Sequence, residues 1–128
     1  MSRLVVDSYA WIEYLYGTEK GRTVSNYLDE NEETFSCALT IAEVISKVAH
    51  KGKSVKTAYE VLTNNSRIIS ADQELSFQAG LIHFQMRKTI KDFGLADAYV
   101  LAAARNLDAK VLTCDVHFKN IKEAILLI

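Results

Sequence analysis

The stretch from Leu4 to Gly17, LVVDSYAWIEYLYG, contains the unit from which the rest of the fold can be inferred. Its first three residues, Leu4-Val5-Val6, form a short apolar run of the kind that makes a buried strand. Asp7 ends this run abruptly, and apolar residues at helical spacing follow it as far as the glycine. The stretch therefore predicts a strand and a helix in close succession, with an acidic residue at their junction.

The same alternation of apolar runs and helical patterns continues along the chain. Further strands are predicted over Thr34–Ala38, Arg67–Ser70, Val111–Thr113 and Ala124–Ile128. Helices are predicted over Arg22–Leu28, from Thr40 to near Gly52, from Ser54 onward, over Asp72–Lys88 and over about Leu95–Leu107. Short, wholly apolar strands that are separated by helices are typical of a parallel sheet covered on both faces. The predicted fold class is therefore α/β.

Length and composition limit the classes of protein to consider. With 128 residues and no proline, the chain has no Pro-rich linker, and we expect residues 1–128 to form one domain. Its 15 Lys and Arg against 16 Asp and Glu give a net charge of -1, which excludes a histone-like polycation. The longest uncharged stretch, Leu75–Met86, is too short to span a bilayer. Without a signal-peptide pattern, and with two separated cysteines, the expected location is the cytoplasm.

Four acidic residues are predicted to meet at one edge of the sheet. Asp7 follows the first strand, Asp115 lies two residues after the fourth, and Glu43 and Asp97 lie in the first turns of predicted helices. Ligands of parallel α/β sheets bind beyond the carboxyl ends of the strands, which is where these side chains are placed. Clustered carboxylates repel one another unless a cation neutralises them, and hard oxygen ligands favour Mg²⁺ or Mn²⁺. The arrangement is typical of metal-dependent phosphodiester hydrolysis.

Each carboxylate also has a purely structural interpretation. Thr40-x-x-Glu43 matches a capping box, and Asp97 at a helix start would interact favourably with the helix dipole. Asp7 could cap a helix, and Asp115 could be an ordinary turn residue. Four independent caps at one edge are nevertheless less expected than one shared site. His117, two residues after Asp115, could contact RNA, but an ordinary loop side chain is the favoured interpretation.

Four segments, in this order, resemble a known family. They are Asp7-Ser8-Tyr9-Ala10-Trp11-Ile12, Thr40-Ile41-Ala42-Glu43-Val44, Leu95-Ala96-Asp97-Ala98-Tyr99-Val100-Leu101-Ala102-Ala103-Ala104 and Thr113-Cys114-Asp115-Val116-His117-Phe118. Together they resemble PIN domains, and among these the stand-alone VapC-type toxins. The resemblance implies a parallel sheet of order 3-2-1-4-5 and a Mg²⁺- or Mn²⁺-dependent endoribonuclease. It further implies a homodimer and a cognate VapB-type antitoxin that blocks the active site.

The resemblance also implies roles for individual residues. It assigns metal binding and catalysis to four acids: Asp7, Glu43, Asp97 and Asp115. Thr113 and Ser8 match hydroxyl positions beside these acids, where they would orient the ligands. The chain departs from the family pattern at Tyr9, where many relatives have a smaller residue, and at Cys114, where relatives often have arginine. Neither departure removes an acidic residue, so we expect activity.

Contacts to RNA and to partner proteins are less well specified by the sequence. Candidate phosphate-binding residues are Lys47, Lys51 and Arg87, and Tyr9 could stack on a base. The broad apolar band of the 72–88 helix predicts an interface with a second copy or an antitoxin. The alternative function is a catalytically silent PIN-like module that binds nucleic acid or protein.

Overall fold

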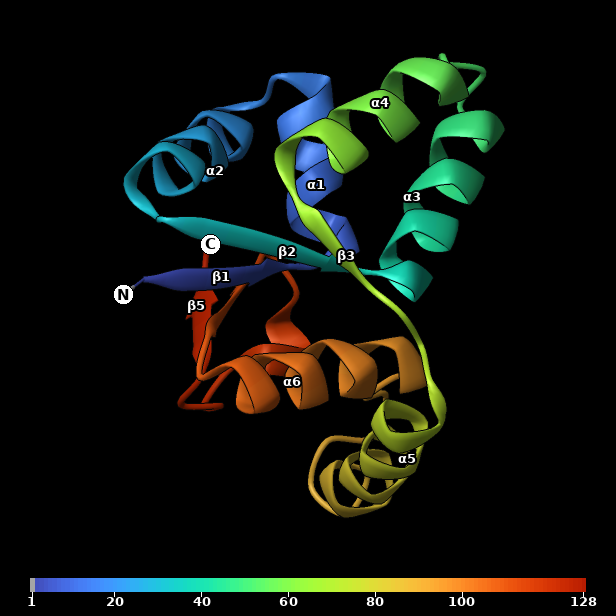
Figure 1. The fold of residues 1–128 in the computed structure, drawn as a ribbon, viewed down its shortest axis with the longest axis vertical. Coiled ribbons are helices and arrows are strands. Elements are labelled where there is room, and N and C mark those ends of the chain that lie inside the picture. The colour runs from blue at the N-terminus through green and yellow to red at the C-terminus, as the bar shows by residue number, and fades with distance from the viewer. Residues whose placement is uncertain (1) are drawn as a thin grey trace.

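The computed structural model describes residues 2–128 and contains a five-stranded sheet between two layers of helices (Figure 1). The strands are β1 (Arg3–Val6), β2 (Glu33–Cys37), β3 (Arg67–Ile69), β4 (Lys110–Thr113) and β5 (Ala124–Leu126). The helices are α1 (Ser8–Tyr16), α2 (Glu19–Glu30), α3 (Ala38–His50), α4 (Val55–Asn65), α5 (Gln73–Met86) and α6 (Leu95–Leu107), with a short 3₁₀ turn over Val116–Phe118. The strand order is β3-β2-β1-β4-β5 and all neighbours pair in parallel. The predicted α/β class and strand order are thereby confirmed.

The sheet separates two hydrophobic cores. Helices α1 to α4 cover one face, and α5 and α6 cover the other (Figure 1). Successive residues of a strand point to opposite faces. Accordingly, Leu4 and Val6 of β1 pack with Trp11 on the α1 side, whereas Val5 packs against the alanine-rich α6. Burial on both faces explains why Leu4, Val5 and Val6, the buried residues of β1, are all apolar.

Two helices begin earlier than the sequence pattern predicted. Helix α2 starts at Glu19, three residues before the predicted Arg22, because the Thr18 hydroxyl caps it by accepting a hydrogen bond from the Gly21 amide at 3.0 Å. Its observed end, at Glu30, also lies beyond the predicted Leu28. Local capping by a threonine thus extends the helix past the apolar stripe from which its length was predicted.

The start of α3 corrects a more consequential expectation. This helix begins at Ala38, which was predicted to end a strand, and its N-cap is Cys37. Thr40 is therefore inside the first turn, so the predicted capping box with Glu43 does not form. The glutamate lies in the second turn rather than the first, and its carboxylate is free of any capping role.

Helix α5 keeps a row of apolar side chains on the surface. Phe77, Leu81 and Phe84, spaced at i, i+4 and i+7, are 71%, 53% and 64% exposed, while Leu75 and Ala79 face the core. One face of α5 is therefore covered by the core and another is uncovered.

No helix within residues 2–128 combines the length and the apolar character needed to cross a membrane.

Candidate metal centre

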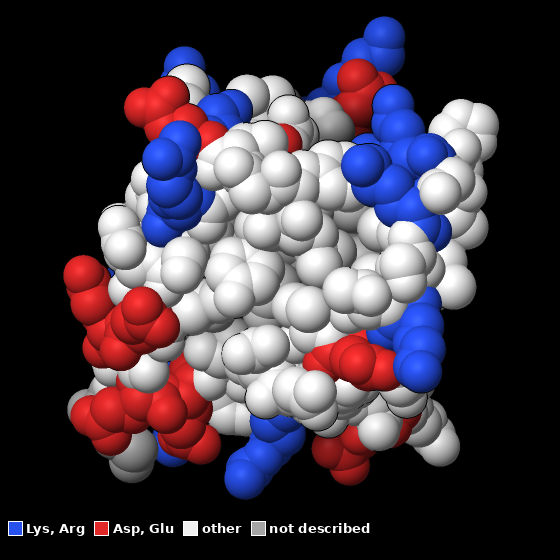
Figure 2. All heavy atoms as spheres, turned by 90° about the horizontal axis from the view of Figure 1, so that it is seen from above, with Lys and Arg blue, Asp and Glu red and all other residues white. Residues whose placement is uncertain are grey.

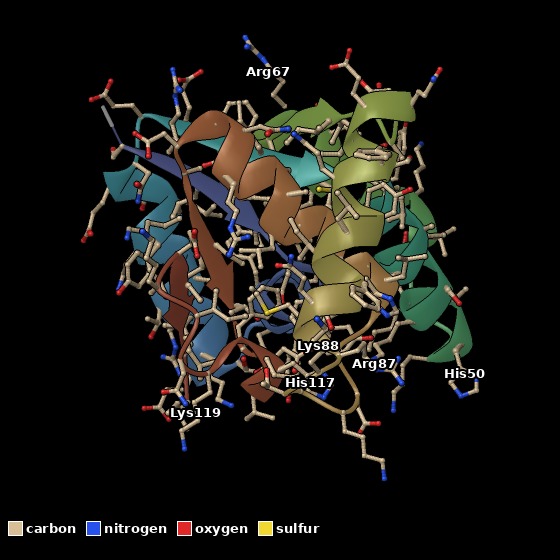
Figure 3. All side chains as sticks on the ribbon, turned by 90° about the horizontal axis from the view of Figure 1, so that it is seen from below. His50, Arg67, Arg87, Lys88, His117 and Lys119 are labelled. Carbon is tan, nitrogen blue, oxygen red and sulfur yellow. The ribbon has the colours of Figure 1, made fainter. Side chains whose placement is uncertain are left out.

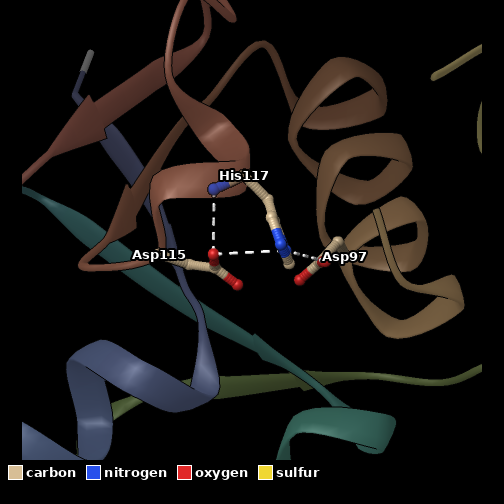
Figure 4. Close-up of side chains that lie close together, drawn as sticks. All are labelled: Asp97, Asp115 and His117. Atoms are coloured by element: carbon tan, nitrogen blue, oxygen red, sulfur yellow. Dashed lines mark hydrogen bonds and ion pairs between the residues drawn. The ribbon is translucent and has the colours of Figure 1, made fainter. Parts of the chain in front are cut away.

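Three aspartates from separate segments lie together beyond the carboxyl end of the sheet. Asp7 follows β1, Asp115 follows β4, and Asp97 is in the first turn of α6. Oxygen atoms of Asp97 and Asp115 and a ring nitrogen of His117 lie within 4.8 Å of one another (Figure 4). β1 and β4 are hydrogen-bonded neighbours, so their ends bring Asp7 and Asp115 to the same place.

Asp7 is the buried member of the cluster, with only 4% of its surface exposed. Its Oδ1 accepts a hydrogen bond from the Ala10 amide at 2.9 Å, which caps α1, and its Oδ2 accepts one from the Thr113 hydroxyl. Burial raises the pKa of Asp7 from 3.8 to about 7; the two hydrogen bonds oppose this rise, and Asp115 and Asp97 add to it. Asp7 therefore caps a helix, as predicted, and also belongs to the acidic cluster.

Asp97 and Asp115 each use one oxygen for a local bond. Asp97 Oδ2 accepts a hydrogen bond from the Gly94 amide, and Asp115 Oδ1 accepts one from the His117 amide, both at 2.9 Å. Within residues 2–128, the second oxygen of each accepts no hydrogen bond. Burial raises the pKa of Asp97, and the neighbouring Asp115 raises it further. Asp97 thus lies at the start of a helix and Asp115 in a turn, as their purely structural interpretations expected. Each side chain nevertheless keeps an oxygen that could bind a cation.

His117 lies inside the cluster rather than on an ordinary loop. Its Nδ1 is 3.3 Å from Asp115 Oδ1 and 3.6 Å from Asp97 Oδ2 (Figure 4). This nitrogen is buried and has no hydrogen-bond partner among the described residues. The signal in the sequence is its position two residues after Asp115, which caps the 3₁₀ turn and so directs the ring back over the acids.

Glu43 approaches the aspartates from α3. Burial raises the pKa of Glu43 and is the largest effect, and the nearby Ser8 hydroxyl lowers it. Asp97 and Asp115 also raise this pKa, and Lys47 lowers it, so all three charges lie near the glutamate. The structure thus brings all four predicted acids, and Ser8, to one end of the sheet.

Thr113 connects two of the acids. Its buried hydroxyl donates to Asp7 and accepts a hydrogen bond from the Asp115 amide at 2.9 Å. One side chain therefore fixes both the direction of the Asp7 carboxylate and the backbone that carries Asp115. Such outer contacts determine how well a set of ligands is arranged before an ion binds.

Removal of the Thr113 hydroxyl should accordingly weaken cation binding. We expect Thr113→Val to lower the affinity for Mn²⁺ about 10- to 100-fold by isothermal titration calorimetry, because the Asp115 amide and Asp7 each lose a partner. Thr113→Ser keeps the hydroxyl and is the matched control, with an affinity within a few-fold of wild type. Equal affinities for the valine and serine variants would contradict this role.

A cleft of about 1100 Å³ opens from the acidic cluster and runs between α1 and α3. Lys47 and Lys51 line this cleft, as does Tyr9, but Arg87 does not. Arg87 directly follows α5 and lies at the same margin of the molecule as His117 in Figure 3, opposite Arg67. The two lysines are therefore the better placed of the predicted phosphate contacts.

The donors of the cluster fit a hard divalent cation. Asp97 and Asp115 offer oxygens without hydrogen bonds, Glu43 faces them, and the charge on these side chains is what Mg²⁺ or Mn²⁺ would neutralise. A soft metal would prefer thiolates. Cys37 and Cys114 belong to the cores on opposite faces of the sheet.

A parallel α/β sheet with acids gathered at its carboxyl edge defines a class of candidate metal-dependent proteins. The PIN domain family model matches residues 4–124, and the chain belongs to this family. Among curated proteins, none matches the chain by sequence.

Several solved structures share the fold. A toxin–antitoxin complex from Klebsiella pneumoniae is 18% identical, with a TM-score of 0.73 over 95% of each chain. VapBC2 from Rickettsia felis, bound to a DNA fragment from its promoter, is 15% identical, with a TM-score of 0.72 over 98% of this chain and 97% of that one. VapC20 from Mycobacterium tuberculosis, a toxin that cleaves the sarcin–ricin loop, is 14% identical, with a TM-score of 0.70 over 98% of this chain and 89% of that one.

Proposed function

We propose that this protein is a Mg²⁺- or Mn²⁺-dependent endoribonuclease and the toxin of a VapBC-type toxin–antitoxin pair. The observation that carries the proposal is the convergence of four acids on a PIN fold: Glu43, Asp97 and Asp115 line an open cleft, and Asp7 is buried beside them. The free oxygens of this cluster suit a hard cation, and the lysines of the cleft suit a phosphate backbone.

In this proposal the four acids hold the metal, and Thr113 and Ser8 keep two of them in position. The bound ion supplies Lewis acidity, which activates a water and offsets the charge that develops on the phosphate. The candidate contacts to RNA are Lys47, Lys51 and Arg87. The two lysines line the cleft, and the arginine lies outside it, at the same margin of the molecule as His117. The reaction is the hydrolysis of a phosphodiester bond.

A VapB-type antitoxin and a second copy of the chain are the proposed protein partners. Structures similar in fold come from VapBC and other toxin–antitoxin complexes, which supports the first. Figure 2 shows that the face formed by α1 to α4 has an uncharged centre with charged residues at its margins. Val55 and Tyr59 of α4 are exposed apolar side chains, as is the row Phe77, Leu81 and Phe84 on α5. Both cysteines are free thiols, in keeping with action in the cytoplasm.

Cleavage of RNA by purified protein tests this function. A mixed RNA pool should be cut in the presence of Mn²⁺ or Mg²⁺, and cutting should stop when EDTA removes the metal. The Asp115→Asn variant, purified in the same way, should be inactive and so exclude a contaminating nuclease. If neither metal supports cleavage and calorimetry detects no binding of either, the nuclease proposal is overturned in favour of the silent binding module.

A further inference from the structure

The Nδ1 atom of His117 faces the acidic cluster without making a hydrogen bond. It lies 3.3 Å from Asp115 Oδ1 and 3.6 Å from Asp97 Oδ2, and Figure 4 shows the ring pointing at both carboxylates. A charge-assisted hydrogen bond between a nitrogen and a carboxylate would be about 2.7–2.9 Å long. Nδ1 is buried from solvent, and within residues 2–128 it has no hydrogen-bond partner. Because a buried polar atom without a partner costs free energy, the position of this nitrogen points to a ligand that it shares with the acids.

The turn that carries His117 is anchored on the segment that leads to Asp97. Phe118, the next residue in this 3₁₀ turn, is only 1% exposed. Its ring centroid lies 5.7 Å from that of Phe93, which is also buried and comes just before the start of α6. Packing between the two rings therefore holds the histidine beside Asp97 before any ion binds, as an effective ligand requires.

The distances within the cluster suit donors that share one six-coordinate cation. An octahedral ion holds its donors at about 2.1 Å, which places neighbouring donors about 3.0 Å apart. The separations of Nδ1 from the two carboxylates, 3.3 Å and 3.6 Å, are only slightly longer. One donor atom each of Asp97, Asp115 and His117 lie within 4.8 Å of one another. Small shifts of these side chains would therefore place the ring nitrogen and both carboxylates on the same ion.

We propose that His117 Nδ1 is a ligand of the divalent cation, beside Asp97 and Asp115, and that it makes the site select Mn²⁺ over Mg²⁺. Mg²⁺ takes oxygen ligands, whereas imidazole is a good ligand for divalent transition metals. The ligating ring is neutral and carries its proton on Nε2. The inference rests on the proposed nuclease function, to which it adds a nitrogen ligand and a preference between the two candidate metals.

Electron spin-echo envelope modulation of bound Mn²⁺ tests the coordination without RNA or turnover. A ring nitrogen bound to Mn²⁺ couples to its electron spins, and protein labelled with ¹⁵N in histidine alone distinguishes this nitrogen from backbone amides. The wild-type protein should show a nitrogen coupling that changes from ¹⁴N to ¹⁵N on labelling, and His117→Ala should lose it. His50→Ala is the matched control, because His50 lines the same cleft from α3 and its loss should leave the coupling unchanged.

The metal preference is measured by isothermal titration calorimetry with the chlorides of Mn²⁺ and Mg²⁺. His117→Ala should weaken Mn²⁺ binding about tenfold or more and Mg²⁺ binding less than about threefold, because only Mn²⁺ gains from the nitrogen. His50→Ala should leave both affinities at their wild-type values. An equal loss of affinity for the two metals in His117→Ala would overturn the preference.

These outcomes are independent of RNA cleavage. If Mn²⁺ binds but the labelled wild-type protein shows no histidine coupling, or His117→Ala keeps the coupling, the ligand assignment is wrong while the nuclease proposal keeps its four acids. If the coupling is present and depends on His117 but no RNA is cut, the ligand assignment stands and the failure belongs to the nuclease proposal.

Discussion

Replacement of Asp97 by asparagine is expected to lower the rate of metal-dependent RNA cleavage about 100- to 1000-fold, equivalent to a few kcal/mol of transition-state stabilisation. An asparagine oxygen can still accept the hydrogen bond from the Gly94 amide, which is 2.9 Å from Asp97 Oδ2. The variant therefore keeps the start of α6 but loses a negative charge beside Asp115 and Glu43. The measurement is the initial rate of cleavage of a labelled RNA at saturating Mn²⁺.

Asp92→Asn is the matched control for this variant. Asp92 is exposed, lies five residues earlier in the chain, and does not line the cleft. It should retain the wild-type rate within about twofold, as most exposed substitutions have little effect. Burial raises the pKa of Asp97, so its neutral replacement should not destabilise the fold. A correctly folded Asp97→Asn protein with the wild-type rate would remove this residue from the proposed catalytic set.

Most of the fold could be predicted because its strands are buried on both faces. Val5 packs on one side of the sheet and Leu4 and Val6 on the other, so these successive residues of β1 all have to be apolar. This pattern, followed by helical spacing, is enough for the α/β class. The order of the strands could not be predicted in this way, because nothing in the sequence of β3 or β5 indicates which neighbour each pairs with. The expected order, which the structure confirms, came from the likeness to PIN domains.

The ends of the elements were harder to predict because tertiary contacts determine them. Thr40-x-x-Glu43 has the spacing of a capping box, yet α3 begins at Ala38 directly after β2. The structure leaves the Thr40 hydroxyl buried without a hydrogen-bond partner among residues 2–128. Local propensity favoured a helix that starts at the threonine, but the tight connection from the strand moved the start.

Details of the site depended on side-chain direction, which spacing does not specify. The convergence of Asp7, Asp97 and Asp115 follows from a rule about strand ends and was predictable. The place of His117 was not, because it depends on a short 3₁₀ turn that Asp115 itself caps. Nor did the sequence indicate that both Asp7 oxygens are already hydrogen-bonded.

This buried position of Asp7 leads to an effect on stability. Without divalent metal, Asp7→Asn is expected to raise the free energy of unfolding at pH 8 by about 1–3 kcal/mol. The pKa of Asp7 is about 7 in the folded protein against 3.8 ordinarily, so the folded protein binds the proton more tightly than the unfolded chain does. The resulting stabilisation is complete below about pH 4 and is lost as the pH rises through 7. Asparagine has no proton to lose, so the variant should lack this dependence.

Urea denaturation in EDTA at pH 5 and pH 8 measures this difference. Asp72→Asn is the matched control, since Asp72 caps α5 by accepting from the Leu75 amide at 2.9 Å but is exposed. Asparagine and aspartate are comparable helix caps, so this variant should differ from wild type by only a few tenths of a kcal/mol. Saturating Mn²⁺ should make the wild-type protein more stable to urea than Asp7→Asn, because the cation stabilises the folded wild type through its carboxylate and binds the variant weakly. If Asp7→Asn is less stable than wild type at pH 8 in EDTA, the carboxylate is held in its charged form by its hydrogen bonds alone, and burial is not the dominant influence on its pKa.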